Sequence, residues 1–153
     1  VVMTAFFRRA TSTHIDTLLG FIRDYYAVDG VSFDMLKQRS ALSGLIANPQ
    51  HGYVWLIELN GKVVGYMAVC FRYSLEFGGR DAFIDELYLM AEARGQGIGT
   101  QAMQVMIDTC RTNGIEAVHL EVSPDHGDAI SYYEESGFSR RDFVMMSRVL
   151  RSS

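Results

Sequence analysis

Hydrophobic positions along the chain recur at two different intervals, and these intervals predict a mixed α/β fold. Spacings of three and four residues predict helices over 14–27 and 34–46. Long apolar runs predict strands, and Asn60-Gly61 between two of them predicts a type I′ hairpin, because both turn residues need positive φ. The expected strands cover residues 5–9, 53–59, 62–71, 82–90, 117–122 and 143–149.

Two further amphipathic helices, over 97–112 and 128–136, complete the order β-α-α-β-β-β-α-β-α-β. A hairpin meander that feeds a β-α-β crossover predicts a mixed sheet, antiparallel at first and parallel across the crossover. The chain contains no repeat, low-complexity tract or linker-like stretch. Residues 1–153 are therefore expected to form a single domain of the α/β (α+β) class.

Composition and charge exclude several classes of partner. With 48% hydrophobic residues the chain can bury a sizeable core, and its net charge of −4 with no basic face argues against nucleic acid. No apolar run approaches the roughly 20 residues of a membrane span, and the first residues lack a secretory-signal pattern, so a cytoplasmic protein without a membrane partner is expected. Cys and His residues are scattered without metal-ligand spacing, so no metal is expected.

Three glycines in five positions, Gly95, Gly97 and Gly99, stand where the helix over 97–112 begins. Glycine costs about 1 kcal/mol per helix position relative to alanine, so a cluster here needs a reason. Without a Cβ, the backbone can approach a ligand closely, and a helix N-terminus offers unpaired N–H groups and partial positive charge. Arg94 adds a full charge. The pattern favours an anion site, typically for phosphate, and a plain turn without a ligand is the alternative.

Two common phosphate-binding loops fit this segment poorly. A Walker loop needs Gly-Lys-Ser/Thr, but Gly99 is followed directly by Thr100. A Rossmann turn needs G-x-G-x-x-G near the start of its domain, whereas here the third glycine comes one residue early and some 90 residues precede the loop.

The segment Arg94-Gly95-Gln96-Gly97-Ile98-Gly99 resembles the R/Q-x-x-G-x-G/A motif of the GCN5-related N-acetyltransferase (GNAT) family, which wraps the pyrophosphate of acetyl-coenzyme A. A second segment, EVSPDHGDAISYYEESGF (121–138), resembles the family's next motif, in which a Tyr stands four residues before Gly-Phe. The element order matches along essentially the whole chain. The resemblance implies a mixed sheet of about six to seven strands flanked by about four helices.

The resemblance also implies acetyl-coenzyme A as co-substrate, with no metal. His126 stands where the family often has an Asn that contacts the coenzyme's arm, and a His can also donate a hydrogen bond. The strand before the loop is implied to contact the arm through its backbone. The implied coenzyme-binding residues are Leu87, Tyr88, Leu89, Arg94, Gly95, Gln96, Gly97, Ile98, Gly99, Thr100, His126 and Tyr133.

The implied reaction transfers an acetyl group from a thioester to a primary amine. Resemblance assigns Tyr133 as the acid that protonates the departing thiolate. The base that takes the amine's proton stays open between Glu86, Asp85, Glu121 and water. Asp85 and Glu86 are adjacent on a strand and are expected to face opposite sides of the sheet. Glu121 stands twelve residues before Tyr133, as does the proposed base of ribosomal-protein N-terminal acetyltransferases.

Substrate specificity is expected from the least patterned segments. Tyr25 and Tyr26, with Asp29 nearby, could hold a cation by stacking and charge, and packing in the core is the alternative. Tyr73 lies in an apparent insertion over 72–79. These features favour a small, cationic amine of the polyamine or aminoglycoside type. A protein or peptide acceptor and a non-catalytic acyl-coenzyme A sensor are the alternatives. The sequence leaves the oligomeric state open, although dimers are common among similar proteins.

Overall fold

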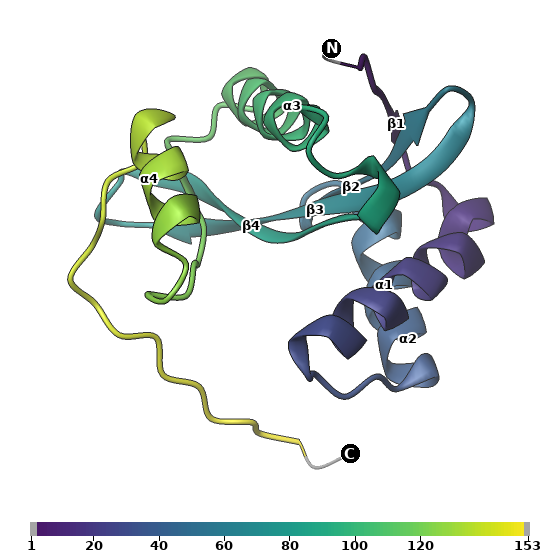
Figure 1. The fold of residues 1–153 in the computed structure, drawn as a ribbon. Helices are drawn as coiled ribbons and strands as arrows, with labels where there is room; N and C mark the ends of the chain where they lie inside the picture. Colours follow the sequence, from purple (N-terminus) through teal and green to yellow (C-terminus); the bar gives the residue numbers. More distant parts are fainter. Residues whose placement is uncertain (1–2, 152–153) are drawn as a thin grey trace. The chain divides into compact units, whose positions relative to one another are not determined.

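The computed structural model describes residues 3–151 and divides at Leu120 into two compact units. The first unit is a five-stranded sheet in the order β1-β2-β3-β4-β5, antiparallel from β1 to β4 and parallel between β4 and β5 (Figure 1). This confirms the predicted mixed sheet. The strands are β1 Phe6–Arg9, β2 Gly52–Leu59, β3 Lys62–Ser74, β4 Gly79–Leu89 and β5 Ala117–His119.

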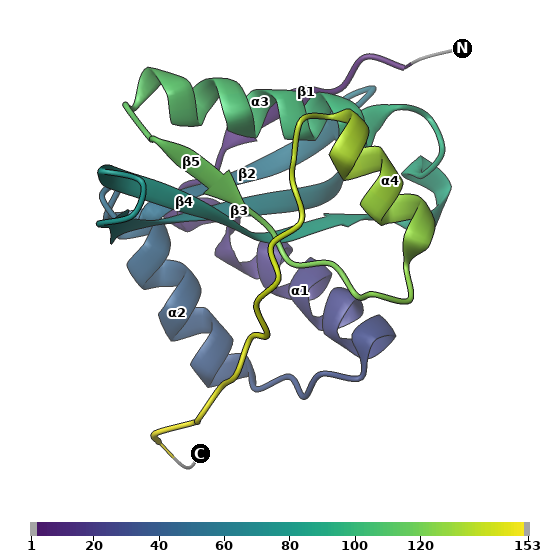
Figure 2. The same ribbon diagram turned by 90° about the vertical axis from the view of Figure 1, so that its left-hand side faces the viewer.

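Helices cover both faces of this sheet. Two of them, α1 (Ile15–Asp29) and α2 (Met35–Ala47), pack on one face, and α3 (Ile98–Thr112) lies on the other, as two perpendicular views show (Figures 1 and 2). Short 3₁₀ turns, η1 (Ser12–His14) and η2 (Ala91–Ala93), precede α1 and α3. The core on the α1–α2 face consists of Leu18, Leu19, Ile22, Leu42, Val54, Leu56, Tyr66 and Ala68.

Local signals explain where the elements begin and end. Asn60 (φ 52°) and Gly61 (φ 77°) both adopt positive φ between β2 and β3, as the predicted type I′ turn requires. The Asp34 side chain accepts a 3.0 Å hydrogen bond from the backbone N–H of Lys37 and so caps the start of α2. Gly30 ends α1 in the left-handed conformation.

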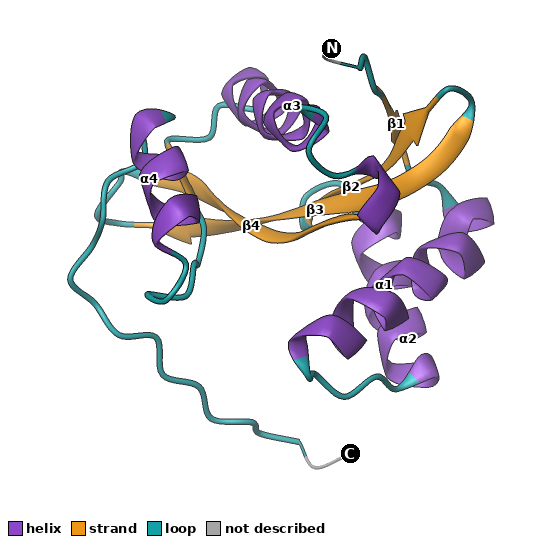
Figure 3. Ribbon diagram, viewed as in Figure 1, coloured by secondary structure: helices purple, strands orange, loops and turns teal. Residues whose placement is uncertain are grey.

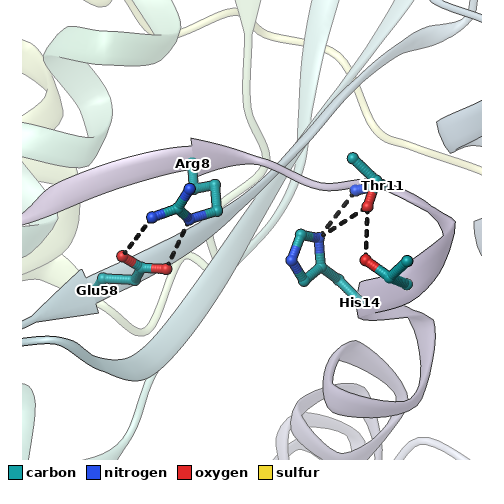
Figure 4. A network of polar contacts seen from close by, with 5 residues as sticks. Arg8, Thr11, His14 and Glu58 are labelled. Carbon is teal, nitrogen blue, oxygen red and sulfur yellow. Dashed lines mark hydrogen bonds and ion pairs between the residues drawn. The ribbon is translucent and has the colours of Figure 1, made fainter.

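Polar contacts fix the entry of the chain into α1 (Figure 4). Arg8 on β1 pairs with Glu58 on β2 across the ladder, with Nε and Oε1 2.9 Å apart. Directly after β1, the backbone N–H of Thr11 donates to Nδ1 of His14 at 3.0 Å, which closes a capping box around the first turn. The short edge strand and the first helix are thus joined at a defined angle.

Two expectations about strands are wrong. The run over 143–149 forms no strand, and β5 stops at His119, so the described residues contain five strands rather than six to seven. Phe143, Met146 and Val149 are 77%, 87% and 84% exposed. An apolar pattern supplies side chains for a sheet, but a strand also needs a hydrogen-bonded neighbour, and residues 139–150 have none in the described chain.

The apparent insertion over 72–79 is not a separate loop. Both β3 and β4 extend into it and meet at a tight turn over 75–78, so most of it is β-hairpin (Figure 3). The second unit contains one helix, α4 (Gly127–Glu135). Across residues 3–151, no helix has both the length and the apolar character needed to cross a bilayer.

Candidate active site

The glycine loop lies between η2 and α3, where the sequence predicted it. Gly95 (φ 73°) and Gly97 (φ 80°) both adopt left-handed conformations, which cost residues with a Cβ roughly 1–2 kcal/mol. Gly97 is also the N-cap of α3 and has no side chain that could cap the helix. The backbone N–H groups of Ile98 and Gly99 have no partner inside the helix and are therefore available to water or to a ligand.

Gly99 differs from its two neighbours because its backbone is ordinary α-helix. A Cβ built at Gly99 or at Gly95 would meet no other atom within 4 Å. Packing within the protein therefore does not require glycine at position 99. Open space beside an uncapped helix N-terminus is what a bound diphosphate would need, so the residues present fit an anion of that kind.

Side chains of the loop brace it against neighbouring elements. Arg94 Nε donates to the carbonyl oxygen of Leu89 at 2.9 Å, and its guanidinium lies 5.7 Å from the centre of the Tyr88 ring. Gln96 Nε2 donates to the carbonyl oxygen of Glu92 at 2.7 Å. The buried Ile98 side chain anchors the start of α3 in the core. The loop is therefore positioned by its side chains, and it can offer its backbone.

Replacing Gly97 by Ala is expected to destabilise the fold by about 1–2 kcal/mol, because Ala must adopt positive φ there. The same change should weaken acetyl-coenzyme A binding, since the loop backbone would shift. Gly44→Ala is the matched control, because Gly44 lies exposed within α2 with nothing within 4 Å of its Cβ position. That control should stabilise the protein by up to about 1 kcal/mol and leave binding unchanged. Thermal melts with and without the coenzyme measure both effects, and equal affinity in the two variants would contradict the role of the loop.

The outer edge of β4 is open beside the loop. Residues Ala117–His119 of β5 pair with β4 only at Asp81, Ala82 and Phe83, and no strand of the described chain pairs with the same edge from Ile84 to Leu89. The predicted contact residues Leu87, Tyr88 and Leu89 lie on this stretch. An edge of this kind can pair with amide groups of an extended ligand, much as with an added strand.

A buried carboxylate on β4 holds this strand to β3 and to β5 just before β4 and β5 separate. Asp81 on β4 is fully buried and accepts two hydrogen bonds from Nε of Arg72 on β3, at 3.0 and 2.9 Å. Nε2 of His119 on β5 lies 2.9 Å from the same carboxylate. Because this charge is satisfied from both neighbouring strands, the three strands are fixed where the parallel ladder ends.

A β-bulge in β4 corrects the expected placement of the two adjacent acids. Ala68 pairs with Glu86 while Val69 pairs with Ile84, so Asp85 is an extra residue without a partner. The expectation that Asp85 and Glu86 face opposite sides assumed unbroken alternation, and the bulge breaks it. Burial raises the pKa of Tyr26 on α1, and both carboxylates raise it further, as expected if both act on the α1–α2 face.

Glu86 lies beside two tyrosines on that face. The hydroxyl of Tyr66 on β3 donates to Glu86 Oε1 at 3.0 Å, and the side chain of Tyr26 on α1 lies close enough to lower the pKa of the carboxyl. Burial raises the pKa of Glu86, the two tyrosines lower it, and the Asp85 charge raises it, with a net upward shift. Partial burial also raises the pKa of Asp85, although its side chain still reaches solvent. Glu86 is thus poised to accept a proton more readily than an ordinary glutamate.

Aromatic rings surround this carboxylate. Tyr25 stacks on Tyr88 with ring centres 5.7 Å apart, and Phe21 lies 6.0 Å from the same ring. Tyr26 contacts Phe33 edge-on at 6.4 Å. Tyr25 and Tyr26 are therefore both packed against the core and close to the acids, so the two alternatives from the sequence are compatible. Sequence reasoning missed Tyr66, although the hairpin register and strand alternation could have placed it opposite Tyr88.

One of the expected substrate residues lies away from Glu86. Tyr73 is 78% exposed and stands seven residues along β3 from Tyr66, about 23 Å at the usual strand rise. Asp29 is the last residue of α1, one helical turn after Tyr26, and is exposed. The structure therefore gathers Tyr25 and Tyr26 at the acids but not Tyr73.

The second unit carries the other predicted catalytic groups. On α4, the Tyr133 ring contacts Phe138 at 5.8 Å and Tyr132 at 5.4 Å between ring centres. The backbone N–H of Phe138 donates to the carbonyl oxygen of Tyr133 at 2.9 Å, which folds the chain back after the helix. Burial is the main cause of a raised Tyr133 pKa, so this hydroxyl stays protonated at neutral pH. Exposed His126 is the N-cap of α4, and Glu121 is also exposed.

No group of three or more His, Cys, Asp or Glu side chains in the described chain is arranged to hold a metal ion. The candidate chemistry consists instead of carboxylates, tyrosines and backbone amides. In the first unit these are the glycine loop, the open β4 edge and the Glu86 cluster. They fit a phosphate-bearing ligand with an extended arm, and an acid–base reaction beside it.

Comparison with known proteins places these features in a family. The chain is 26% identical over 147 residues to an uncharacterized N-acetyltransferase of Methanocaldococcus jannaschii, and the matched stretch covers 94% of this chain and 65% of that protein. The chain therefore spans slightly less than two thirds of the length of that relative. It is also 24% identical over 136 residues to an aminoalkylphosphonate N-acetyltransferase of Salmonella typhimurium, covering 89% of this chain and 86% of that protein.

Solved structures share the fold. A predicted acetyltransferase of Clostridium acetobutylicum, solved with acetyl-coenzyme A, has a TM-score of 0.79 at 19% identity, over 96% of this chain and 97% of that one. An aminoglycoside acetyltransferase from an uncultured soil metagenomic sample, in complex with sisomicin, has a TM-score of 0.77 at 18% identity over the same fractions. The acetyltransferase (GNAT) family matches residues 18–138, a range that includes the glycine loop, the Glu86 cluster and Tyr133. The chain therefore belongs to the GNAT family of N-acetyltransferases, as the glycine motif and the Tyr-Gly-Phe spacing implied.

Proposed function

We propose that the chain is an acetyl-coenzyme A-dependent N-acetyltransferase that acetylates a primary amine of a small, cationic molecule by direct attack in a ternary complex. The observation that carries this proposal is one strand, β4, that combines an open edge, an adjacent glycine loop and a tyrosine-bound carboxylate. The amine nitrogen forms an amide bond with the acetyl carbon, the carbon–sulfur bond breaks, and the sulfur takes up a proton.

Acetyl-coenzyme A supplies the acetyl group as a thioester. The backbone from Gly95 to Gly99 would hold its diphosphate, because these amides stand at an uncapped helix N-terminus. The β4 edge at Leu87, Tyr88 and Leu89 would pair with the amides of its arm, and exposed His126 would add a hydrogen bond. A backbone N–H on that edge would also stabilise charge on the thioester oxygen.

Glu86 is the proposed base. A lysine-like ammonium has a pKa near 10.4 and no free lone pair, so the amine must lose a proton before it attacks. Glu86 would accept that proton directly or through water, because burial raises its pKa toward neutrality. Asp85, beside it in the bulge, would attract the cation, and Glu121 stays the rival base.

Tyr133 is the proposed acid that protonates the departing thiolate. Its raised pKa keeps the proton available at neutral pH. This role requires residues 1–153 to act as one domain, which the family match across residues 18–138 supports, since it spans both compact units.

The acceptor is proposed to be cationic because its site contains two carboxylates and several aromatic rings. The Tyr26 side chain lies near Asp85 and Glu86, and Tyr25 stacks on Tyr88 of the strand that carries both acids; carboxylates and rings of this kind suit an ammonium group. Relatives named for aminoalkylphosphonate and aminoglycoside substrates support a small-molecule amine, and the aminoglycoside is the cationic one of the two.

Adding acetyl-coenzyme A is expected to raise the melting temperature. A ligand at a hundred times its dissociation constant adds about 2.7 kcal/mol of stability, which corresponds to roughly 5–10 °C for a chain of this length. Release of free thiol during incubation with a panel of polyamines, aminoglycosides, neutral amines and short peptides then measures turnover. No thermal shift at millimolar coenzyme would contradict binding. A shift without thiol release for any acceptor would instead indicate a sensor, and release with peptides alone would identify a peptide acceptor.

A further inference from the structure

Tyr66 is buried on β3, and the family resemblance assigns it no role. Its side chain is 1% exposed, and its hydroxyl donates to Glu86 Oε1 at 3.0 Å. An ionised carboxylate can only accept hydrogen bonds, so the tyrosine must be the donor. Among the described residues, every buried polar side-chain atom has a hydrogen-bond partner. The partner of the Tyr66 hydroxyl is Glu86.

A phenylalanine at position 66 would fill nearly the same volume without burying a polar group. Its ring would keep the contacts with Phe21 at 6.5 Å and Tyr88 at 6.3 Å. Burying a hydroxyl costs free energy unless it is hydrogen-bonded, so packing alone does not explain the tyrosine. The hydroxyl is explained by the carboxylate that it contacts.

We propose that Tyr66 is a positioning residue, which fixes the orientation of Glu86 and keeps its carboxyl ionised so that it can accept the amine's proton. This inference rests on the proposed function of Glu86. Tyr66 donates to the carboxyl from the sheet, and Tyr26 on α1 lies near the same carboxyl. Remaining lone pairs of the carboxylate are then available to the acceptor.

Groups from α1, β3 and β4 surround Glu86. From α1 come Tyr25 and Tyr26, from β3 Tyr66 and Cys70, and from β4 Asp85 and Tyr88, while the Arg94 guanidinium lies over the Tyr88 ring. Burial raises the pKa of Tyr66 and Tyr26, and raises that of Cys70 to about 11, so these groups stay neutral donors. Asp85 is the acidic neighbour whose charge raises the pKa of Glu86.

Tyr66→Phe removes the 3.0 Å hydrogen bond to Glu86, which lowers the pKa of this carboxyl, so that pKa should rise. Activity that needs ionised Glu86 should then be lost at higher pH than in the wild type. We expect the acid limb of the kcat/KM profile to move up by about one pH unit. Tyr53→Phe is the matched control, since it removes a tyrosine hydroxyl bonded to Asn113 Oδ1 at 3.0 Å, away from Glu86, and should leave the profile in place.

Two further measurements keep the test decisive. Carboxyl-carbon NMR of Glu86 in the free protein should report the same upward pKa shift without any turnover. In a Glu86→Gln background, adding Tyr66→Phe should change the rate less than twofold, because a residue that acts through Glu86 has nothing left to position. Superimposable profiles and unshifted carboxyl titrations for wild type and Tyr66→Phe would overturn the inference. A wild type that lacks acetyl transfer, or lacks an acid limb, would refute the role of Glu86 instead.

Discussion

Glu86→Gln is expected to lower kcat/KM at pH 7 by about 10²–10⁴-fold, the usual contribution of a general base. Gln keeps the carbonyl oxygen that can accept from Tyr66 and has nearly the same volume, so the fold and coenzyme binding should persist. The deficit should shrink as pH rises, since the free-amine fraction of a lysine-like acceptor grows about tenfold per pH unit below 10.4. Steady-state kinetics from pH 6 to 10 with the best acceptor of the amine panel measures this dependence.

Two matched variants decide between the candidate bases. Asp85→Asn and Glu121→Gln each remove one carboxylate charge, and both should lose far less activity than Glu86→Gln at neutral pH. The wild-type acid limb should lie above the ordinary pKa of glutamate, because burial raises that of Glu86, and in Glu86→Gln it should be replaced by a rise that continues to the pKa of the amine. A wild-type limb that persists in Glu86→Gln but is lost in one of the other variants would move the base to that residue.

Most of the first unit could be predicted because its signals are local. The Asn60-Gly61 turn and the Gly97 helix start each depend on residues within a few positions, and each appears where the pattern placed it. The glycine motif gave both a structural element and a ligand class, since positive φ and an open helix N-terminus follow from the same residues.

What could not be predicted depends on long-range pairing. The bulge at Asp85 is a mismatch between β3 and β4, and no property of Asp85 and Glu86 alone reveals it. Tyr66 becomes a partner of Glu86 only once the register across the hairpin is known. The run over 143–149 has the composition of a strand, yet forms no ladder among the described residues, because pairing needs a neighbouring strand as well as a pattern.

The register of β4 also explains how this strand can be paired within the sheet, offer an open edge to a coenzyme and carry acids for an acceptor. Up to Phe83, β4 is paired on both sides and is secured by the buried Asp81. Beyond it, the edge away from β3 is open, and the bulge adds Asp85 as an extra acid next to Glu86. Coenzyme contacts through the backbone and acceptor contacts through side chains can therefore be made at the same residues without competing for the same atoms.

Tyr133→Phe is expected to lower kcat by about 10²-fold, the lower end for a general acid. A thiol of pKa near 8.5 is already a fair leaving group, so it needs less help than an alkoxide would. Phe retains the ring that packs on Phe138, so the loss should be confined to the hydroxyl, and acetyl-coenzyme A affinity should stay within about twofold.

Tyr132→Phe is the control, because its ring lies about 100° away around α4 and its hydroxyl should not reach the same atom. Single-turnover kinetics and coenzyme titration separate the two effects. Loss of coenzyme binding with unchanged turnover of the bound enzyme would make Tyr133 a binding residue instead, and the thiolate would then have to take its proton from water.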